Sequence, residues 1–375
     1  MAEFLLELYS EEIPPQLQIN ARKELKQILE KSIQEEGLKY KALKIYSSPT
    51  RLAIFIQNLS EEVKILPKEI KGPKVGVPEN ILESFIKSQK VNKSDVFERE
   101  IEKGYFYFIK TKPKKTLTKD ILVKIIPKSL NEIKWKKSMK WSDDNLMWGR
   151  PLRSIFAIFN NKILNFNYHH LNSTNSVIIE KDLITKTRSI KTFKEYNSFL
   201  KNNKILLDHT ERKTKILKRF ETICRSKNYK ENFKTQLLEE VTNIVDNPNV
   251  LLVDFNKDYL KIPSEIIIST LQGHQRYFPL FDSKDNLTNF FLVVANKADG
   301  KNFIKEGNKR VVEARLADAK FFWNKDKSKN LIKQIGKLKT ITFYDKLGTI
   351  YDKTQRLRKL AALISDQLNI NKEKI

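Results

Sequence analysis

Cysteine and histidine are scarce in this chain. Of its 375 residues, one is cysteine, Cys224, and four are histidine: His169, His170, His209 and His274. A single cysteine excludes an internal disulfide framework and a cysteine-rich zinc site. Four histidines argue against a multi-histidine metal centre, although carboxylates alone can also hold a metal ion. We therefore assign no metal site from the sequence.

The common catalytic motifs are also missing. The chain has no Gly-x-x-x-x-Gly-Lys-Ser/Thr loop, no Gly-x-Gly-x-x-Gly turn, no Gly-x-Ser-x-Gly elbow and no His-Glu-x-x-His helix. The chain therefore lacks the signatures of P-loop nucleotide hydrolysis, dinucleotide binding, serine hydrolysis and zinc proteolysis. Lys137–Lys140 matches a fragment of the class I synthetase lysine loop, but the accompanying His-Ile-Gly-His signature is absent, so we treat it as chance. We assign no catalytic residue and expect no complete active site in this chain.

Long hydrophobic runs are absent as well. The longest apolar run, Phe290–Ala295, is far shorter than the roughly 20 residues that span a bilayer. The first twelve residues carry Glu3 and Glu7 inside an apolar run and lack a basic leader, which is typical of a strand and not of a signal peptide. With a lone cysteine, these features favour a cytoplasmic protein without a membrane partner.

Positive charge is abundant. The chain has 71 Lys and Arg against 45 Asp and Glu, a net charge of +26. Residues 181–230 carry 15 basic and 5 acidic side chains, a net +10, and residues 101–150 carry 13 and 5, a net +8. Such an excess favours polyanionic partners, above all nucleic acid. A lysine-rich proteome would produce the same excess without any partner.

The spacing of apolar residues predicts the first elements. Phe4–Tyr9 reads as a strand, and apolar residues recur at helical spacing over Leu17–Ile33. Ala42–Tyr46 and Arg51–Gln57 flank Ser-Ser-Pro-Thr, which predicts a hairpin. Together these elements form an α+β module.

The rest of the chain predicts further mixed modules. The Pro- and Lys-rich residues 61–78 read as a connection, and Gly104–Ile109 and Val250–Phe255 read as strands. The basic residues 181–230 read mostly as helices. The last predicted helix, Tyr351–Leu368, places its apolar residues inward on one face.

We therefore predict a multidomain α+β fold, with N-terminal mixed modules followed by a largely helical C-terminal region. The predicted segments are an α+β module over residues 1–60, a second α+β module with a Trp-rich segment over 61–180, a basic helical segment over 181–235, an α+β module with a His-Gln-Arg-Tyr-Phe-Pro motif over 236–305, and a helical region over 306–375.

Several longer motifs are distinctive in combination. They are Glu7–Pro15, Ser48–Ala53, Lys137–Trp141 with Trp148–Leu152, Ile262–Leu280, Glu306–Trp323 and Leu347–Lys353. In order and rough spacing they closely resemble the β subunit of the bacterial-type, two-subunit glycyl-tRNA synthetase. The resemblance covers essentially the whole chain. One departure is that the family's Gly-His-Arg-Phe segment is replaced here by residues 172–178.

The resemblance implies a role that composition alone does not give. In that family a separate α subunit carries the class II active site for ATP, with Mg, and glycine. The β subunit handles tRNA-Gly and needs no cofactor of its own, and the complex is an α2β2 heterotetramer. Family β subunits continue into an HD-like helical region and an anticodon-binding domain. We therefore expect this chain to be an N-terminal half that ends near the start of the HD-like domain.

Basic and aromatic residues of these segments are the candidates for tRNA binding. They are Lys213, Lys215, Lys218, Arg219, Gln275, Arg276, Tyr277, Arg310 and Arg315. The four basic residues at 213–219 lie on one predicted helix and are equally well explained as a solvated face. Arg276 can bind phosphate and Tyr277 can stack on a base, but Tyr277 can equally be core. Arg310 and Arg315 can contact an RNA backbone or form local ion pairs with neighbouring acids.

Tryptophans are interpreted separately. Trp141, Trp148 and Arg150 are candidates for a domain junction or subunit interface, because tryptophan favours buried and interfacial positions. Arg51, at the opening of a strand, can contact RNA or orient the turn, and we favour the structural interpretation. The leading hypothesis is a tRNA-binding β subunit of glycine–tRNA ligase. The alternative is a stand-alone, non-catalytic RNA-binding protein derived from that subunit.

Overall fold

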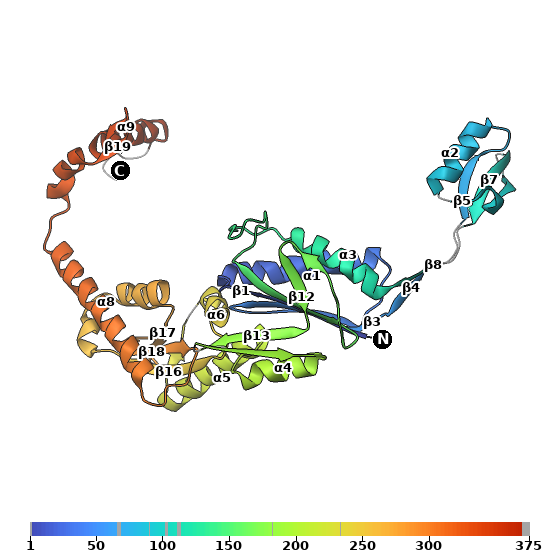
Figure 1. The fold of residues 1–375 in the computed structure, drawn as a ribbon. Helices are drawn as coiled ribbons and strands as arrows, with labels where there is room; N and C mark the ends of the chain where they lie inside the picture. The colour runs from blue at the N-terminus through green and yellow to red at the C-terminus, as the bar shows by residue number, and fades with distance from the viewer. Residues whose placement is uncertain are drawn as a thin grey trace.

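A seven-stranded sheet organises the first half of the chain (Figure 1). The computed structural model describes residues 2–65, 69–89, 91–101, 104–110, 114–181, 183–232 and 234–369. The spatial order is β11 (Asn167–Tyr168), β12 (Leu171–Thr174), β9 (Leu152–Phe159), β1 (Ala2–Ser10), β3 (Arg51–Leu59) and β2 (Ala42–Ser48), and β10 (Lys162–Ile163) pairs with β9. All pairs are antiparallel except β12 with β9. The sheet thus joins strands from the first two predicted segments.

Both faces of this sheet are covered. Helices α1 (Pro15–Glu35) and α3 (Thr118–Asn131) lie on one face, and α4 (Phe193–Asn202) lies on the other beside the hairpin of β13 (Ser176–Lys181) and β14 (Ile184–Ser189) (Figure 1). Strand β1 therefore buries Phe4, Leu6 and Leu8 against the helices and Leu5 against the opposite layer. Each fully buried side chain of this kind contributes roughly 1.5–3 kcal/mol.

The predicted first helix and hairpin are confirmed. Helix α1 buries Leu17, Leu25 and Ile33, and the chain leaves it through Gly37, whose φ of 69° favours glycine. The prediction that residues 181–230 are mostly helical is confirmed by α4 and by a helix over His209–Lys227, but the strand β14, whose six residues are all exposed, was not predicted. Only its pairing with β13 makes it a strand, and its side chains give no buried pattern to reveal it.

A small module is inserted into the first half. Strands β4 (Glu62–Ile65) and β8 (Lys114–Leu117) pair and bracket it. Between them lie β5 (Glu69–Lys74), α2 (Glu79–Gln89), β6 (Val96–Ile101) and β7 (Gly104–Lys110), with a sheet order β5-β7-β6. The prediction that residues 61–78 are only a connection is therefore wrong. The partners of β4 and β5 are β8 and β7, which follow dozens of residues later in the sequence. No local sequence pattern therefore predicts these pairings.

A second sheet forms the core of the next region. Its order is β15 (Lys230–Glu231), β17 (Phe278–Phe281), β18 (Leu287–Ala295) and β16 (Asn249–Asp254), all antiparallel. Helices α5 (His209–Lys227) and α6 (Thr235–Thr242) pack on one face. Helices α7 (Ser264–Ser269) and α8 (Phe303–Lys327) and the π-helical turn Thr270–His274 pack on the other.

The C-terminal region is largely helical, as predicted. It contains a 3-10 segment (Ile332–Thr340), the short strands β19 (Thr342–Tyr344) and β20 (Gly348–Thr349), and α9 (Ile350–Gln367). The prediction that α9 turns its apolar residues inward is wrong for Leu357, Leu360, Ile364 and Leu368, which are 48–62% exposed. Helical spacing shows which residues share a face, but it does not show that another element covers that face.

Candidate nucleic-acid interface

The basic face of α5 follows from its local sequence. Asp208 caps the helix by accepting a hydrogen bond from the backbone N–H of Thr210 at 2.8 Å, and Asn228 ends it in the left-handed conformation. Ile216 and Phe220 face the second sheet and are fully buried. Because the helix repeats every 3.6 residues, the positions between them point to solvent. Lys218 and Arg219 lie between them and Lys215 precedes them, and all three are exposed.

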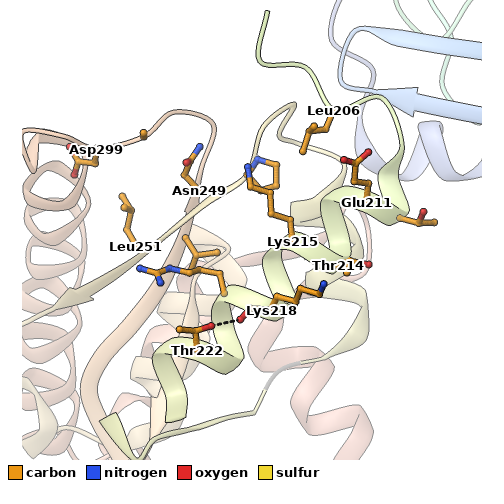
Figure 2. A pocket seen from close by; sticks show the side chains of 14 residues that line it. Leu206, Glu211, Thr214, Lys215, Lys218, Thr222, Asn249, Leu251 and Asp299 are labelled. Carbon is orange, nitrogen blue, oxygen red and sulfur yellow. Dashed lines mark hydrogen bonds between the residues drawn. The ribbon is translucent and has the colours of Figure 1, made fainter. Parts of the chain in front are cut away.

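A groove of about 810 Å³ runs along this face (Figure 2). Helix α5 forms one wall, and the start of β16 with residues 298–299 forms the other. The polar and charged side chains that line it are those of Thr210, Glu211, Thr214, Lys215, Lys218, Arg219, Thr222, Asn249 and Asp299. The structure therefore brings three of the predicted basic residues to one cavity, together with hydroxyl and amide groups.

The cations of the groove differ in whether another side chain already binds them. Lys215 donates from Nζ to Asn247 Oδ1 at 2.8 Å, and burial lowers its pKa. Lys218 and Arg219 are exposed, and neither forms an ion pair with any residue that the structure describes. Both charges are thus available to an anion, such as a phosphate or a carboxylate.

The two acids of the groove already have partners. Glu211 accepts an ion pair from Lys201 at 2.9 Å. Asp299 accepts hydrogen bonds from the backbone N–H groups of Ile304, at 3.2 Å, and Lys305, at 2.7 Å, at the start of α8. The carboxylates therefore do not cancel the positive charge of Lys218 and Arg219 by direct contact.

Lys213 lies apart from this set. Its ammonium pairs with Glu239 of α6, so the predicted quartet divides into three groove residues and one structural ion pair. Sequence reasoning missed the opposite wall, Asn249 and Asp299, because long-range packing alone brings those residues to α5. The helical period itself could have identified Thr214 and Thr222, which lie four residues from Lys218.

The segment Gln275–Tyr277 follows the π-helical turn. Arg276 has a φ of 58° and pairs through Nε with Glu240 Oε1 at 2.6 Å, while Gln275 is half-buried. Tyr277 is 9% exposed, stacks on Phe291 with 5.1 Å between ring centroids, and donates its hydroxyl to Asn308. Base stacking on Tyr277 is therefore a wrong interpretation, because the ring is part of the core.

Arg310 and Arg315 project from α8. Both are exposed, since Val312 and Leu316 turn the other side of the helix to the sheet. Neither arginine forms an ion pair within the described residues, and Glu313 instead accepts the backbone N–H of Asn256 at 3.1 Å. Helices α5 and α8 lie on opposite faces of the second sheet, and neither arginine lines the α5 groove.

The tryptophan segment belongs to the first core. Trp148 is 1% exposed and lies 4.9 Å from Trp135 between ring centroids, so the residue predicted for a domain junction or subunit interface lies inside the first core. Trp141 is half-buried against the same core, and Arg150 is half-buried and donates to the Gly149 carbonyl at 2.7 Å. A surface role stays open only for Trp141 and Arg150.

Comparison with known proteins shows the family of the chain. Residues 4–375 match the family model described as glycyl-tRNA synthetase beta subunit. The chain belongs to this family. It is 36% identical over 377 residues to the glycine–tRNA ligase beta subunit of Clostridioides difficile (strain 630), covering 99% of this chain and 55% of that protein. The corresponding proteins of Phenylobacterium zucineum (strain HLK1) and Rickettsia felis are 35% and 32% identical, each over 96% of this chain. The chain spans about half the length of these relatives.

The family motifs of the first module are structural in this chain. Glu7 and Arg51 come from two different motifs and form a buried ion pair of 3.0 Å between β1 and β3. The Tyr196 hydroxyl donates to the same Glu7 oxygen, and Arg51 also donates to the Ile178 carbonyl. The structural interpretation of Arg51 is thus confirmed.

A polar junction joins the two sheets. Gln18 of α1 donates to the Asn243 carbonyl at 2.8 Å, and Arg22 donates to the Asn243 side chain at 2.9 Å. Arg212 is fully buried and donates to the carbonyls of Leu206, Leu207 and Thr242. Burial lowers the pKa of Arg212 to about 10, which leaves it charged at neutral pH.

In the part of the chain that the structure describes, no helix combines the length and the apolar character needed to cross a membrane. Among the same residues, no group of three or more His, Cys, Asp and Glu side chains is placed to hold a metal ion.

Proposed function

We propose that this chain is the tRNA-handling part of a glycine–tRNA ligase β subunit. In this proposal a separate α subunit binds ATP, Mg and glycine, activates the glycine and attaches it to tRNA-Gly. The two subunits form an α2β2 complex. The chain holds tRNA-Gly and delivers its acceptor end to the α subunit, which is a proximity role. Family membership over residues 4–375 carries the proposal.

The groove along α5 supports the RNA-binding part of this proposal. Lys218 and Arg219 supply unpaired positive charge, and the groove lies on a chain whose net charge is +26. Lysine contacts with phosphate position an RNA without reading its sequence. Binding should therefore weaken steeply with salt, because each neutralised phosphate releases counterions.

A charging assay tests the division of labour. Aminoacylation of tRNA-Gly is measured with α subunit alone, with α subunit plus this chain, and with both plus the C-terminal part of a longer relative. We expect no charging by α subunit alone and restoration on adding the chain, with or without the C-terminal part. Glycine-dependent ATP–pyrophosphate exchange by the purified chain alone would contradict the proposal. RNA binding without any association with α subunit would favour the stand-alone alternative.

Charge reversal tests the groove itself. The double variant Lys218→Glu/Arg219→Glu should bind tRNA at least tenfold more weakly at low salt and show a shallower salt slope. Lys26→Glu/Lys31→Glu, on the exposed face of α1, is the matched control because it changes the net charge equally. Equal losses in the two variants would show that only total charge matters and that the groove is not the binding site.

A further inference from the structure

The inserted module has one covered and one open sheet face. Helix α2 packs on the face that carries Ile109, which is fully buried. A Cβ at Gly72 of β5 would lie 2.4 Å from the Phe85 ring of α2, so the helix approaches this face closely. Figure 1 shows the module with α2 beside β5 and β7. The opposite face of the sheet carries the alternate residues of each strand.

Aromatic rings line the open face. Phe106 and Phe108 alternate with the residues that face α2, and the register places Phe97 of β6 beside Phe108. The rings of Phe97 and Phe108 stack with 6.1 Å between centroids; Phe108 is buried at 8% exposure, whereas Phe97 is 37% exposed. Phe106 is half-buried. Two phenylalanines on adjacent strands therefore present accessible rings on a sheet surface.

Cations are interleaved with these rings. The Lys71 ammonium lies 3.6 Å from the centroid of the Phe106 ring, and the Arg99 guanidinium lies 5.9 Å from that of Phe108. The Lys71 side chain thus lies over the Phe106 ring, and a base that displaces this side chain would reach the ring. Lys74 and Lys110 occupy positions on the same face.

The charge of the module is sorted between its faces. Residues 69–110 contain 8 basic and 7 acidic residues, a net +1. Among the residues of the module that the structure describes, the open face holds Lys71, Lys74, Arg99 and Lys110 against the acid Glu69, a net +3, and Glu69 pairs with Arg99. The other acids that the structure describes here lie on α2, in the 3-10 turn that precedes β6, and on the other side of β6. Such sorting favours an anionic ligand at the aromatic face.

We propose that this face binds unpaired nucleotides of an RNA. Bases stack on Phe97 and Phe106, and Lys71, Lys74 and Arg99 meet the adjoining phosphates. Aromatic rings with flanking cations suit single strands, because unpaired bases can splay onto rings, whereas the bases of a duplex are already stacked. The site lies on a different module from the α5 groove and does not depend on glycine charging.

Fluorescence anisotropy with the full 375-residue chain tests this site. The probes are a labelled oligouridine of twelve nucleotides and a blunt, fully paired RNA hairpin. Phe97→Leu/Phe106→Leu keeps the apolar volume and removes the π faces, and it should weaken oligouridine binding roughly tenfold or more. Binding of the hairpin should not change. Tyr105→Leu is the matched control, because Tyr105 is 52% exposed on β7 and its side chain belongs to the opposite face.

Photo-crosslinking of the unaltered chain gives an independent readout. Oligouridine containing 4-thiouridine should crosslink within residues 96–108, and crosslinks confined to α5 would overturn the proposal even if the leucine variant failed to fold. Unchanged oligouridine affinity in the leucine variant, or an equal loss in Tyr105→Leu, would overturn it as well. Loss of α-subunit association with intact RNA binding would assign the face to a protein contact instead. Because Lys218→Glu/Arg219→Glu leaves this module untouched, failure of the α5 groove would be seen separately.

Discussion

Replacing Arg51 by methionine should destabilise the first module strongly. Arg51 is 2% exposed and donates from Nε to Glu7 Oε2 at 3.0 Å and from Nη1 to Thr50 Oγ1 at 2.9 Å. Methionine replaces the aliphatic stem of arginine but removes the charge and all of these donors. Glu7, itself 1% exposed, would keep only the Tyr196 hydroxyl as a donor among the contacts described.

The expected magnitude follows from the unpaired carboxylate. Removing one partner of a buried ion pair costs roughly 3–5 kcal/mol, because the other charge stays buried without compensation. A native domain has only about 5–15 kcal/mol of stability, so the variant should be close to unfolded at moderate denaturant. Urea unfolding, monitored by the fluorescence of the tryptophans packed in this module, measures the loss.

The loss should depend on pH. Burial already raises the pKa of Glu7 above 4.5, and the charge of Arg51 opposes that rise. Without Arg51 the folded-state pKa rises further, so folding of the variant takes up a proton. Its stability is then greatest below the unfolded pKa of Glu7 and falls as the pH rises through the folded pKa. The deficit should be larger at pH 8 than at pH 5.

The double variant Glu7→Gln/Arg51→Met is the decisive control. Glutamine removes the buried charge, so the double variant should be more stable than Arg51→Met at pH 8. A loss below about 1 kcal/mol for Arg51→Met would refute the reasoning, since that is the range of exposed pairs. An equal loss at pH 5 and pH 8, or no recovery in the double variant, would do the same.

Three further predictions concern other sites. Gly72→Ala should loosen the inserted module by about 1–3 kcal/mol, because its Cβ would meet the Phe85 ring at 2.4 Å; hydrogen exchange confined to residues 69–110 would report it, and unchanged protection would count against it. Arg212→Leu should lower stability by roughly 3 kcal/mol, because three backbone carbonyls lose their donor in a buried junction, and a thermal midpoint within 1 °C of the parent would contradict this. Cys224, whose pKa burial raises to about 12, should react with a disulfide reagent at pH 8 far more slowly in the folded chain than in urea, and equal rates would disprove its burial.

The sequence predicted elements whose signals are local. The helix over residues 15–35 and the hairpin that follows it carry clear periodicity, a turn and a glycine stop, and all three lie where expected. Strands β4, β5 and β14 were not predicted, because pairing with their partner strands, and not their own side-chain pattern, makes them strands. The inward face predicted for α9 failed for a different reason: spacing identifies an apolar stripe but says nothing of what lies opposite it.

The candidate site divides in the same way. Helical spacing placed Lys215, Lys218 and Arg219 on an exposed face of α5, and the structure lines a groove with them. The wall opposite comes from β16 and the approach to α8, about 30 to 85 residues later, so no local pattern could reveal it. Tyr277 was ambiguous for the reason that an aromatic residue before a strand suits both a core and a binding surface, and only its packing on Phe291 decides between them.

The place of β1 between β3 and β9 has a consequence during synthesis. Phe4 pairs with Phe159 of β9, which is synthesised 100 residues after β3 ends at Leu59. One edge of β1 therefore stays unpaired until β9 has been made. At 5–20 residues per second this wait lasts roughly 5–20 s. Throughout it, a leucine-rich strand edge stays unpaired and open to association with other nascent chains. The inserted module, complete before β9 emerges, makes up much of this interval, and a longer insertion would extend the time for which this edge stays unpaired.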